Sequence, residues 1–270
     1  MNRLGVLGWP VAHSRSPAIQ NAALRATGLA GSWHYQLLPV PAELLDETVR
    51  ALPASGFRGV NVTIPHKEAV LALATGASAR ATAIGAANTL LFGDDGQIWA
   101  DNTDAPALTQ ALAQRTELAG ASVLVLGAGG SARAAVWALL DAGAGEVLVW
   151  NRTPERAAEL AADLGARAVA QPLPAADILV NCTAVGLHHQ DELEALLLST
   201  HQLDRHRAVA DFVYREGGTP LARAAHASGV PTIDGLELLV GQGAIAFELF
   251  TGKTAPAQAM RDAIGLSSAP

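Results

Sequence analysis

Residues 121–134 read Ala121-Ser-Val-Leu-Val-Leu-Gly-Ala-Gly-Gly-Ser-Ala-Arg-Ala134, and this stretch decides the fold of the second half of the chain. Its first six residues form a continuous apolar run, which is typical of a strand buried on both faces of a parallel sheet. Glycines follow at once, and an apolar helix is predicted over 134–142. A glycine-rich turn between a buried strand and a helix indicates a dinucleotide site, where Gly127 permits the tight turn and Gly129 lets the backbone approach a pyrophosphate.

The next predicted strand, 146–150, is followed by arginines and by no acidic residue at its end. In sites for NAD, an acidic side chain at about this place binds the ribose hydroxyls, whereas a nearby arginine accommodates the 2′-phosphate of NADP. Arg152 and Arg156 flank Thr153, and both can donate charge-assisted hydrogen bonds to a phosphate. Solvation of a helix start is the alternative role for the two arginines. With the glycine turn upstream, the pattern favours NADP over NAD.

Composition restricts the class of protein. A chain of 270 residues, half of them apolar, predicts two domains, and a net charge of −7 argues against general nucleic-acid binding. We find no apolar run of 18 residues and no signal peptide, so neither a membrane span nor export is expected. The single cysteine, Cys182, fits a reducing compartment, and we expect a cytoplasmic protein. The eight histidines, including the pair His188-His189, show no metal-ligand spacing, so no metal is predicted.

Strands and helices alternate along the chain, which predicts an α/β fold. The predicted strands are 4–8, 34–40, 59–64, the end of the segment 81–91, 97–100, 121–126, 146–150, 177–183, 208–214 and 230–233. The predicted helices are 17–28, 42–52, 67–73, 106–112, 134–142, 220–228, 236–250 and 255–264.

Three polar features of the first half are candidates for chemistry. Of 18 basic residues, 16 are arginine, so Lys67 in the stretch Gly59-Val-Asn-Val-Thr-Ile-Pro-His-Lys67 keeps a titratable amine that arginine cannot supply. Ser14 and Ser16 precede a predicted helix, where Ser16 is expected as the N-cap and both hydroxyls could also hold an anion. The run Asp101-Asn-Thr-Asp104 precedes another helix, and a cap accounts for only one or two of its four polar residues.

Taken together, these motifs resemble the shikimate dehydrogenase family along nearly the whole chain. The motifs stand in the family's order as His13-Ser-Arg-Ser-Pro17, Asn61-Val-Thr-Ile-Pro-His-Lys67, Ile84-Gly-Ala-Ala-Asn-Thr-Leu90, Asp101-Asn-Thr-Asp104, Gly127-Ala-Gly-Gly-Ser-Ala-Arg133, Asn151-Arg-Thr153, Asp211-Phe-Val-Tyr214 with Thr219-Pro-Leu221, and Gly235 with Gln242-Gly-Ala244. Each motif is weak alone, and eight in this order are specific.

The resemblance implies an α/β substrate domain over 1–101, a Rossmann-like NADP domain with a mostly parallel sheet over 102–236, a cleft between them, and C-terminal helices over 237–270 that pack on the first domain. It implies a catalytic pair, Lys67 and Asp104. The residues that it implies for substrate binding are Ser14, Ser16, Thr63, Lys67, Asn88, Asp104, Tyr214 and Gln242. Those that it implies for cofactor binding are Gly127, Ala128, Gly129, Gly130, Ser131, Asn151, Arg152, Thr153, Arg156, Thr183, Phe212 and Gly235.

The activity that the resemblance implies is the reversible NADPH-dependent reduction of 3-dehydroshikimate to shikimate, a step of aromatic amino-acid biosynthesis through chorismate. A carboxylate beside a lysine favours the ammonium form, so we expect Lys67 to act mainly as a cation that donates to the ketone oxygen. Two alternatives stay open, an NAD-dependent quinate/shikimate dehydrogenase and a non-catalytic ligand-sensing homologue. The sequence also leaves a homodimer open.

Overall fold

The structure is a computed structural model that describes residues 1–188 and 191–266. His189 and the last four residues of the predicted segment 237–270 therefore lie outside the described residues. The described residues divide into two compact units, the first within 1–103 and 239–266 and the second within 104–238. The boundary near the C-terminus falls within a single helix, α9 (Gly235–Thr251).

The first unit is built on a six-stranded sheet with the order β2-β1-β3-β5-β6-β4. Its strands are β1 (Asn2–Gly8), β2 (Trp33–Pro39), β3 (Phe57–Val62), β4 (Gly76–Ala77), β5 (Thr89–Phe92) and β6 (Ile98–Asp101). Strand β5 pairs antiparallel with both β3 and β6, whereas the other pairings are parallel. The amino end of β5 therefore lies at the same rim of the sheet as the carboxyl ends of β1, β3 and β6.

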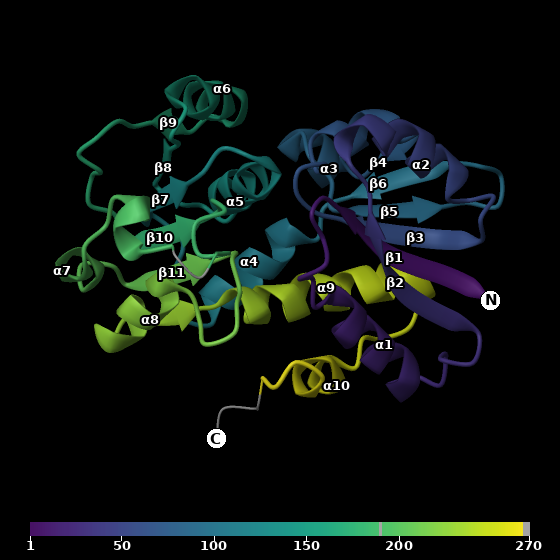
Figure 1. Cartoon of the computed structure of the whole chain (residues 1–270). Helices are drawn as coiled ribbons and strands as arrows, with labels where there is room; N and C mark the ends of the chain where they lie inside the picture. Colours follow the sequence, from purple (N-terminus) through teal and green to yellow (C-terminus); the bar gives the residue numbers. More distant parts are fainter. Residues whose placement is uncertain (189–190, 267–270) are drawn as a thin grey trace. The chain divides into compact units, whose positions relative to one another are not determined.

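Helices cover both faces of this sheet (Figure 1). They are α1 (Ser16–Ala26), η1 (Ala42–Leu44), α2 (Leu45–Ala51), η2 (Ala69–Leu73), α3 (Ala79–Ile84), α10 (Ala257–Asp262) and the first unit's part of α9. On one face, Leu45 and Val49 of α2 join a buried cluster with Leu7 and Val60. On the other, the amide of Gln20 in α1 donates to the carbonyl of Gly243 in α9 over 2.8 Å.

The second unit holds a six-stranded parallel sheet with the order β12-β11-β10-β7-β8-β9. Its strands are β7 (Ser122–Leu126), β8 (Glu146–Trp150), β9 (Arg167–Ala168), β10 (Ile178–Asn181), β11 (Ala208–Asp211) and β12 (Thr232–Ile233). Its helices are α4 (Asp104–Ala113), α5 (Gly130–Asp141), α6 (Pro154–Leu164), η3 (Leu193–Leu196), α7 (Thr200–Leu203), α8 (Pro220–Ala227) and the start of α9. This doubly wound α/β arrangement confirms the predicted fold class.

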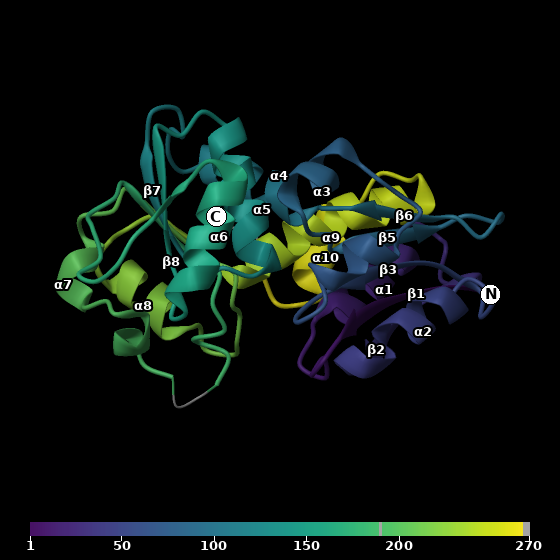
Figure 2. The ribbon, with the colours of Figure 1, turned by 90° about the horizontal axis from the view of Figure 1, so that it is seen from above.

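Side-chain alternation explains why this sheet is buried on both faces. Val123 and Val125 pack into a cluster with α4, α5 and α6, whereas Leu124 and Leu126 pack into a second cluster with η3, α7 and α8. Successive strand residues point to opposite faces, so an unbroken apolar run supplies two cores at once. Figures 1 and 2 show α5 and α6 on one side of this sheet and α7 and α8 on the other.

None of the helices in the described ranges is both long enough and apolar enough to cross a membrane.

Candidate active site

The rim of the first sheet gathers loops that are far apart in the sequence. The loop after β1 carries Ser14, and the loop after β3 carries Thr63 and Lys67. The two loops start side by side, because a Cβ added at Gly8 would collide with the side chain of Thr63. Ligands of α/β sheets bind outside the carboxyl ends of the strands, which is where these side chains lie.

Ser14 and Ser16 lie together at the start of α1. The backbone N–H of Ser16 donates to the Ser14 hydroxyl over 3.3 Å, while the Ser16 side chain is buried in the first turn. Arg15 occupies the N-cap position and makes no side-chain capping bond. The expected capping role of Ser16 is therefore wrong, and it is Ser14 whose side chain accepts from the first turn.

Lys67 is buried, with a relative exposure of 9 %. Its carbonyl accepts from the N–H of Ala87 over 2.8 Å, which ties the loop after β3 to the segment just before Asn88. A helix was predicted to start at Lys67, but the helical segment is the short η2, which begins at Ala69. The chain thus places Lys67 in a loop and holds it there through the backbone.

Asn88, Thr103 and Gln242 form a polar cluster in the first unit, in which Asn88 and Thr103 are buried and Gln242 is partly buried. The Asn88 side-chain oxygen accepts from the Thr103 N–H over 2.8 Å, and its amide nitrogen lies 3.0 Å from the Thr103 hydroxyl and 3.5 Å from Gln242 Oε1. Gln242 Nε2 donates to the carbonyl of Leu239 over 2.9 Å, so its oxygen is the end that faces the cluster. The structure thus brings together two predicted substrate residues from segments 154 positions apart.

A second row of polar side chains stands behind Asn88. The Tyr35 hydroxyl donates to Asn61 Oδ1 over 2.8 Å, Asn61 Nδ2 donates to the Thr89 hydroxyl over 3.1 Å, and that hydroxyl donates to Asn88 Oδ1 over 3.0 Å. All four side chains are buried. Because a buried network of this kind fixes which end of each amide points where, it holds Asn88 in one orientation.

The run Asp101–Asp104 uses each polar residue differently. Asp101 forms a two-pronged ion pair with Arg80, and Asn102 Nδ2 donates to the carbonyl of Ala86 over 3.0 Å. Burial raises the pKa of Asp101, but hydrogen bonds from Arg80, Ser78 and the Asn102 N–H outweigh it and lower the pKa below its usual value. Asp104 opens α4 and is buried. Thr103 was not predicted as a site residue, although it hydrogen-bonds with Asn88. The sequence held one indication of its role, because a helix cap explains only one or two of the four polar residues in this run.

Asp104 and Tyr214 belong to the second unit, whose parallel sheet carries the predicted cofactor residues. Gly127 follows β7 at φ +109°, and a Cβ there would lie 3.0 Å from the carbonyl carbon and oxygen of Cys182. The strand order reverses between β7 and β10, which is the switch point where open α/β sheets bind ligands. Only glycine suits both the left-handed backbone and this close approach.

The helix that follows Gly127 starts at a glycine. Gly129 is the N-cap of α5 and makes no side-chain capping bond, and Gly130 and Ser131 form the first turn. A helix start of this kind favours an anion. Ala128 is buried in the core cluster on the α5 face of the sheet.

At the end of β8, Asn151 Nδ2 donates to the carbonyl of Thr153 over 3.0 Å, and Arg152, Thr153 and Arg156 are exposed. Glu155 is the acidic residue of this helix start, one place before Arg156. The residue directly after β8 is Asn151, not the acidic residue that binds the ribose hydroxyls in NAD sites. The side chains exposed next to it include two arginines.

Thr183, Phe212 and Gly235 also lie at the carboxyl edge of this sheet. Both donors of Thr183 are used within the protein, because its N–H and its hydroxyl lie 3.0 and 2.7 Å from Asn181 Oδ1. A ligand at Thr183 would therefore meet its carbonyl and methyl groups. A Cβ at Gly235 would collide with the carbonyl of Val213, so this glycine allows the start of α9 to pack on the segment after β11.

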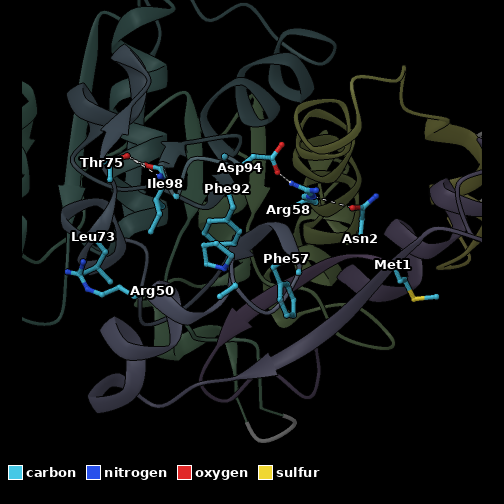
Figure 3. Close-up of a pocket in the computed structure, with 15 residues that line it drawn as sticks. Met1, Asn2, Arg50, Phe57, Arg58, Leu73, Thr75, Phe92, Asp94 and Ile98 are labelled. Atoms are coloured by element: carbon cyan, nitrogen blue, oxygen red, sulfur yellow. Dashed lines mark hydrogen bonds and ion pairs between the residues drawn. The ribbon is translucent and has the colours of Figure 1, made fainter.

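A pocket of about 780 Å³ lies at the opposite end of the first sheet, where β1 and β3 begin (Figure 3). Phe57, Phe92 and Leu73 line it, and Arg58 at its edge forms an ion pair with Asp94. It contains none of the predicted site residues. The geometry at the carboxyl ends of the strands, rather than this hollow, identifies the candidate site.

Comparison with known families matches three profiles along the chain. Residues 6–90 match "Shikimate dehydrogenase substrate binding domain", residues 108–197 match "Shikimate / quinate 5-dehydrogenase", and residues 235–264 match "Shikimate 5'-dehydrogenase C-terminal domain". The profiles therefore cover both compact units.

Individual relatives are similar over nearly the full length. The "Shikimate dehydrogenase (NADP(+))" of Methanothermobacter thermautotrophicus is 40 % identical over 272 residues, which is 96 % of this chain and 94 % of that protein. The protein of the same name from Methylobacterium radiotolerans is 47 % identical over 93 % of this chain and 91 % of its own. A crystal structure of shikimate 5-dehydrogenase from Thermus thermophilus in complex with NADP(H) and shikimate superimposes with a TM-score of 0.86 at 42 % identity, covering 97 % of this chain and 98 % of that one. The chain belongs to the shikimate dehydrogenase family.

Proposed function

We propose that this chain is an NADP-dependent shikimate dehydrogenase, an oxidoreductase that interconverts 3-dehydroshikimate and shikimate on the route to chorismate and the aromatic amino acids. The observation that carries the proposal is the 40–47 % identity to proteins of this name over almost the whole of both chains. The Asn88–Thr103–Gln242 cluster supports it, because hydroxyl-rich ligands need closely spaced donors and acceptors.

We assign shikimate binding to residues 1–101 with the C-terminal segment 237–270, and NADP binding to residues 102–236. In this assignment Ser14, Ser16 and Tyr214 hold the substrate carboxylate. The ring hydroxyls bind to Thr63, Asn88, Asp104 and Gln242. Ser14 supports this division of roles, because its hydroxyl already lies at the start of α1, where an anion is favoured.

Lys67 and Asp104 form the proposed catalytic pair. The Lys67 ammonium donates to the ketone oxygen of 3-dehydroshikimate and stabilises the negative charge that develops there on reduction. Asp104 orients the ammonium and a neighbouring ring hydroxyl, and relays the proton that the oxygen gains. Burial of Lys67 and Asp104 supports these roles, because water screens such charges less in a buried site.

The residues of the second unit fit the cofactor. The backbone of Gly127 and Gly129 leaves room for a pyrophosphate, and the start of α5, from Ala128 to Ser131, presents its N–H groups to it. Asn151, Arg152, Thr153 and Arg156 bind the adenosine 2′-phosphate, whereas Thr183, Phe212 and Gly235 border the nicotinamide end. When bound, NADPH supplies the hydride that reduces the ketone carbon.

A spectrophotometric assay tests the proposal directly. Purified protein with shikimate and NADP should produce NADPH, which absorbs at a wavelength where NADP does not. An enzyme that shows no such oxidation of shikimate, although it is folded by circular dichroism, contradicts the proposed function and favours the non-catalytic ligand-sensing alternative.

The NAD-dependent quinate/shikimate alternative is tested in the same assay. Its support would be an acidic residue at the end of β8, and Asn151 stands there instead. We expect kcat/KM to be higher with NADP than with NAD, and with shikimate than with quinate. A homodimer and a cytoplasmic location stay predictions, which light scattering after gel filtration and cell fractionation test.

A further inference from the structure

Asp211, the last residue of β11, is a carboxylate with no exposed surface and no role in the chemistry proposed above. Its two oxygens accept three hydrogen bonds. Oδ1 accepts from the Val213 N–H over 3.0 Å and from Asn181 Nδ2 over 2.9 Å, and Oδ2 accepts from the Thr219 hydroxyl over 2.6 Å. The side chain therefore joins the ends of β10 and β11 to the start of α8.

The contact with Asn181 extends to Thr183. Because Asn181 points its nitrogen at Asp211, its oxygen must face the other way, where it accepts from both the N–H and the hydroxyl of Thr183. The Thr183 hydroxyl in turn accepts from the Val185 N–H over 3.1 Å. One carboxylate thus sets the orientation of an amide, and that amide sets the conformation of the loop after β10.

The loop after β11 depends on the same carboxylate. The bond from the Val213 N–H closes a turn over Phe212, and Tyr214 follows directly. The Val213 carbonyl packs on Gly235 at the start of α9. Asp211 therefore fixes the backbone that carries Phe212, a proposed cofactor residue, and Tyr214, a proposed substrate residue. The same backbone packs on the start of α9.

Keeping a carboxylate here costs stability. Burial, together with a smaller effect of the nearby charge of Asp234, raises the pKa of Asp211 to about 6 despite its three hydrogen bonds. An asparagine would fill the same volume without that desolvation cost. A group that costs stability and meets two ligand-binding loops has the features of a positioning residue.

We propose that Asp211 is a positioning residue for ligand binding, which through Asn181 and Val213 holds Thr183, Phe212 and Tyr214 in the arrangement that binds NADP and shikimate. The proposal rests on the proposed function for its substrate, but its effect on NADP binding can be measured without turnover.

Asp211→Asn is the first test. Its neutral amide oxygen can still accept from Asn181 and Val213, but both bonds weaken because they lose the negative charge of the carboxylate. Its nitrogen would face the Thr219 hydroxyl, which then loses its acceptor. Asp177→Asn is the matched control, because Asp177 accepts from the N–H and the hydroxyl of Ser122, both over 2.8 Å, at the opposite edge of the same sheet. For each protein we would measure the Kd for NADP by calorimetry, the KM for shikimate, kcat, and the unfolding midpoint in urea.

We expect Asp211→Asn to raise the Kd for NADP and the KM for shikimate by about three- to tenfold, the equivalent of one buried hydrogen bond, while Asp177→Asn leaves both at the wild-type values. A variant whose urea midpoint falls but whose Kd and KM stay those of the wild type would show that Asp211 serves the fold alone and would overturn the proposal. Wild-type protein that binds NADP but does not oxidise shikimate would contradict the proposed function, and the Kd comparison would still decide the role of Asp211.

If Asp211→Asn does not fold, Thr219 gives a second route. Thr219→Val removes the hydroxyl that holds Asp211 Oδ2, so the carboxylate can turn away from Asn181 and Val213 and the Kd for NADP should rise. Thr219→Ser retains the hydroxyl, with its bond to Asp211 and its cap on the Ala222 N–H, and should leave the Kd at the wild-type value. Equal Kd values in the two variants would contradict the proposal, since both change the same position at the N-cap of α8.

Discussion

The backbone N–H of Thr103 donates to the side-chain oxygen of Asn88 over 2.8 Å, and this bond fixes which end of the Asn88 amide points into the site. The Thr89 hydroxyl donates to the same oxygen over 3.0 Å, so its acceptor capacity is used within the protein. The nitrogen is left as the end that lies toward Gln242. We therefore expect Asn88 to act toward a ligand hydroxyl as a donor, in exchange for its present bonds to the Thr103 hydroxyl and Gln242 Oε1.

Asn88→Asp tests that orientation with little change in shape. The carboxylate can still accept from Thr103 and Thr89, but it loses the donor and places a negative charge next to Gln242 Oε1. We expect the KM for shikimate to rise by about 10- to 100-fold, as for a lost hydrogen bond with an unpaired group left behind. Thr109→Val removes a hydroxyl that donates to the carbonyls of Ala105 and Pro106 in its own helix, and this control should leave KM unchanged.

Lys67→Ala should lower kcat by about 10²–10⁴ with a smaller effect on the KM for shikimate, because a group that stabilises developing charge acts mainly in the transition state. Steady-state kinetics in both directions measure this. Lys253→Ala is the matched control, since Lys253 is the other lysine of the chain and is exposed beyond the end of α9. A near-normal kcat in Lys67→Ala would remove this residue from the mechanism.

Arg152→Ala and Arg156→Ala should each raise the KM for NADP by about tenfold or more and leave the KM for NAD nearly unchanged, because a charge-assisted bond to the 2′-phosphate is lost. The ratio of kcat/KM values for the two coenzymes is the measurement. Arg167→Ala controls for the loss of positive charge on this unit, since Arg167 is exposed and pairs with Glu146. Equal losses with NADP and NAD would contradict binding of the phosphate.

Gly127→Ala should destabilise the fold and weaken NADP binding together. At φ +109° the new methyl group would lie 3.0 Å from the backbone of Cys182, so the cost exceeds that of the backbone conformation alone. Gly165→Ala separates the two effects, because Gly165 also has positive φ, at +79°, but faces open space. We expect a loss of about 1 kcal/mol for Gly165→Ala and roughly twice as much or more for Gly127→Ala in urea unfolding.

Asp211 should make stability fall as the pH rises from about 4 to 6. Its pKa is about 6 in the folded protein, against 3.8 as the ordinary value, so the folded state holds a proton that the unfolded state has released. Stability therefore decreases through this window, by up to about 3 kcal/mol at pH 7. Asp101 and Asp177, whose pKa values are lowered, act in the opposite direction and lose their contribution in acid.

The difference between wild type and Asp211→Asn isolates this effect. We expect the difference in unfolding free energy to change with pH between about 4 and 6 and to be flat above about 7. A pH-independent difference would mean that Asp211 is not protonated in the folded state within this window.

The strands with long apolar runs were predicted well, because a short continuous apolar segment is typical of a strand buried on both faces of a parallel sheet. The strand at 146–150 is confirmed to the residue as β8, and the run at 121–126 forms β7 apart from its first residue, since both lie between parallel neighbours. Two of the two-residue strands, β4 and β9, were missed, whereas β12 (Thr232–Ile233) falls within the predicted strand 230–233. Gly76–Ala77 and Arg167–Ala168 lie at sheet edges, where pairing on one side only requires little hydrophobicity and leaves no periodic signal.

Residues typical of helix starts gave a wrong prediction at two loops, those before α1 and before η2. Pro17 marks the start of α1 correctly, but Ser16 enters the helix because the Ser14 hydroxyl supplies the acceptor. The pattern after Pro65 predicted a helix from Lys67, whereas the backbone there pairs with Ala87. Such long-range pairs, like Asn88 with Gln242 and Asn181 with Asp211, arise from the packing of strands and helices, which spacing along the chain does not reveal.

The reversed direction of β5 determines how Asn88 reaches the rim of the first sheet. Strands β1, β3 and β6 end at this rim, whereas β5 begins there, so Asn88 precedes a strand and stands among residues that follow strands. Its backbone N–H donates to the carbonyl of Asp101, and its carbonyl accepts from the N–H of Val62, which closes the rim from both sides. In the second sheet every strand runs the same way, and the start of α5 follows β7 at the carboxyl edge, where a helix dipole favours an anion. One inverted strand thus distinguishes the rim of the first sheet from that of the second.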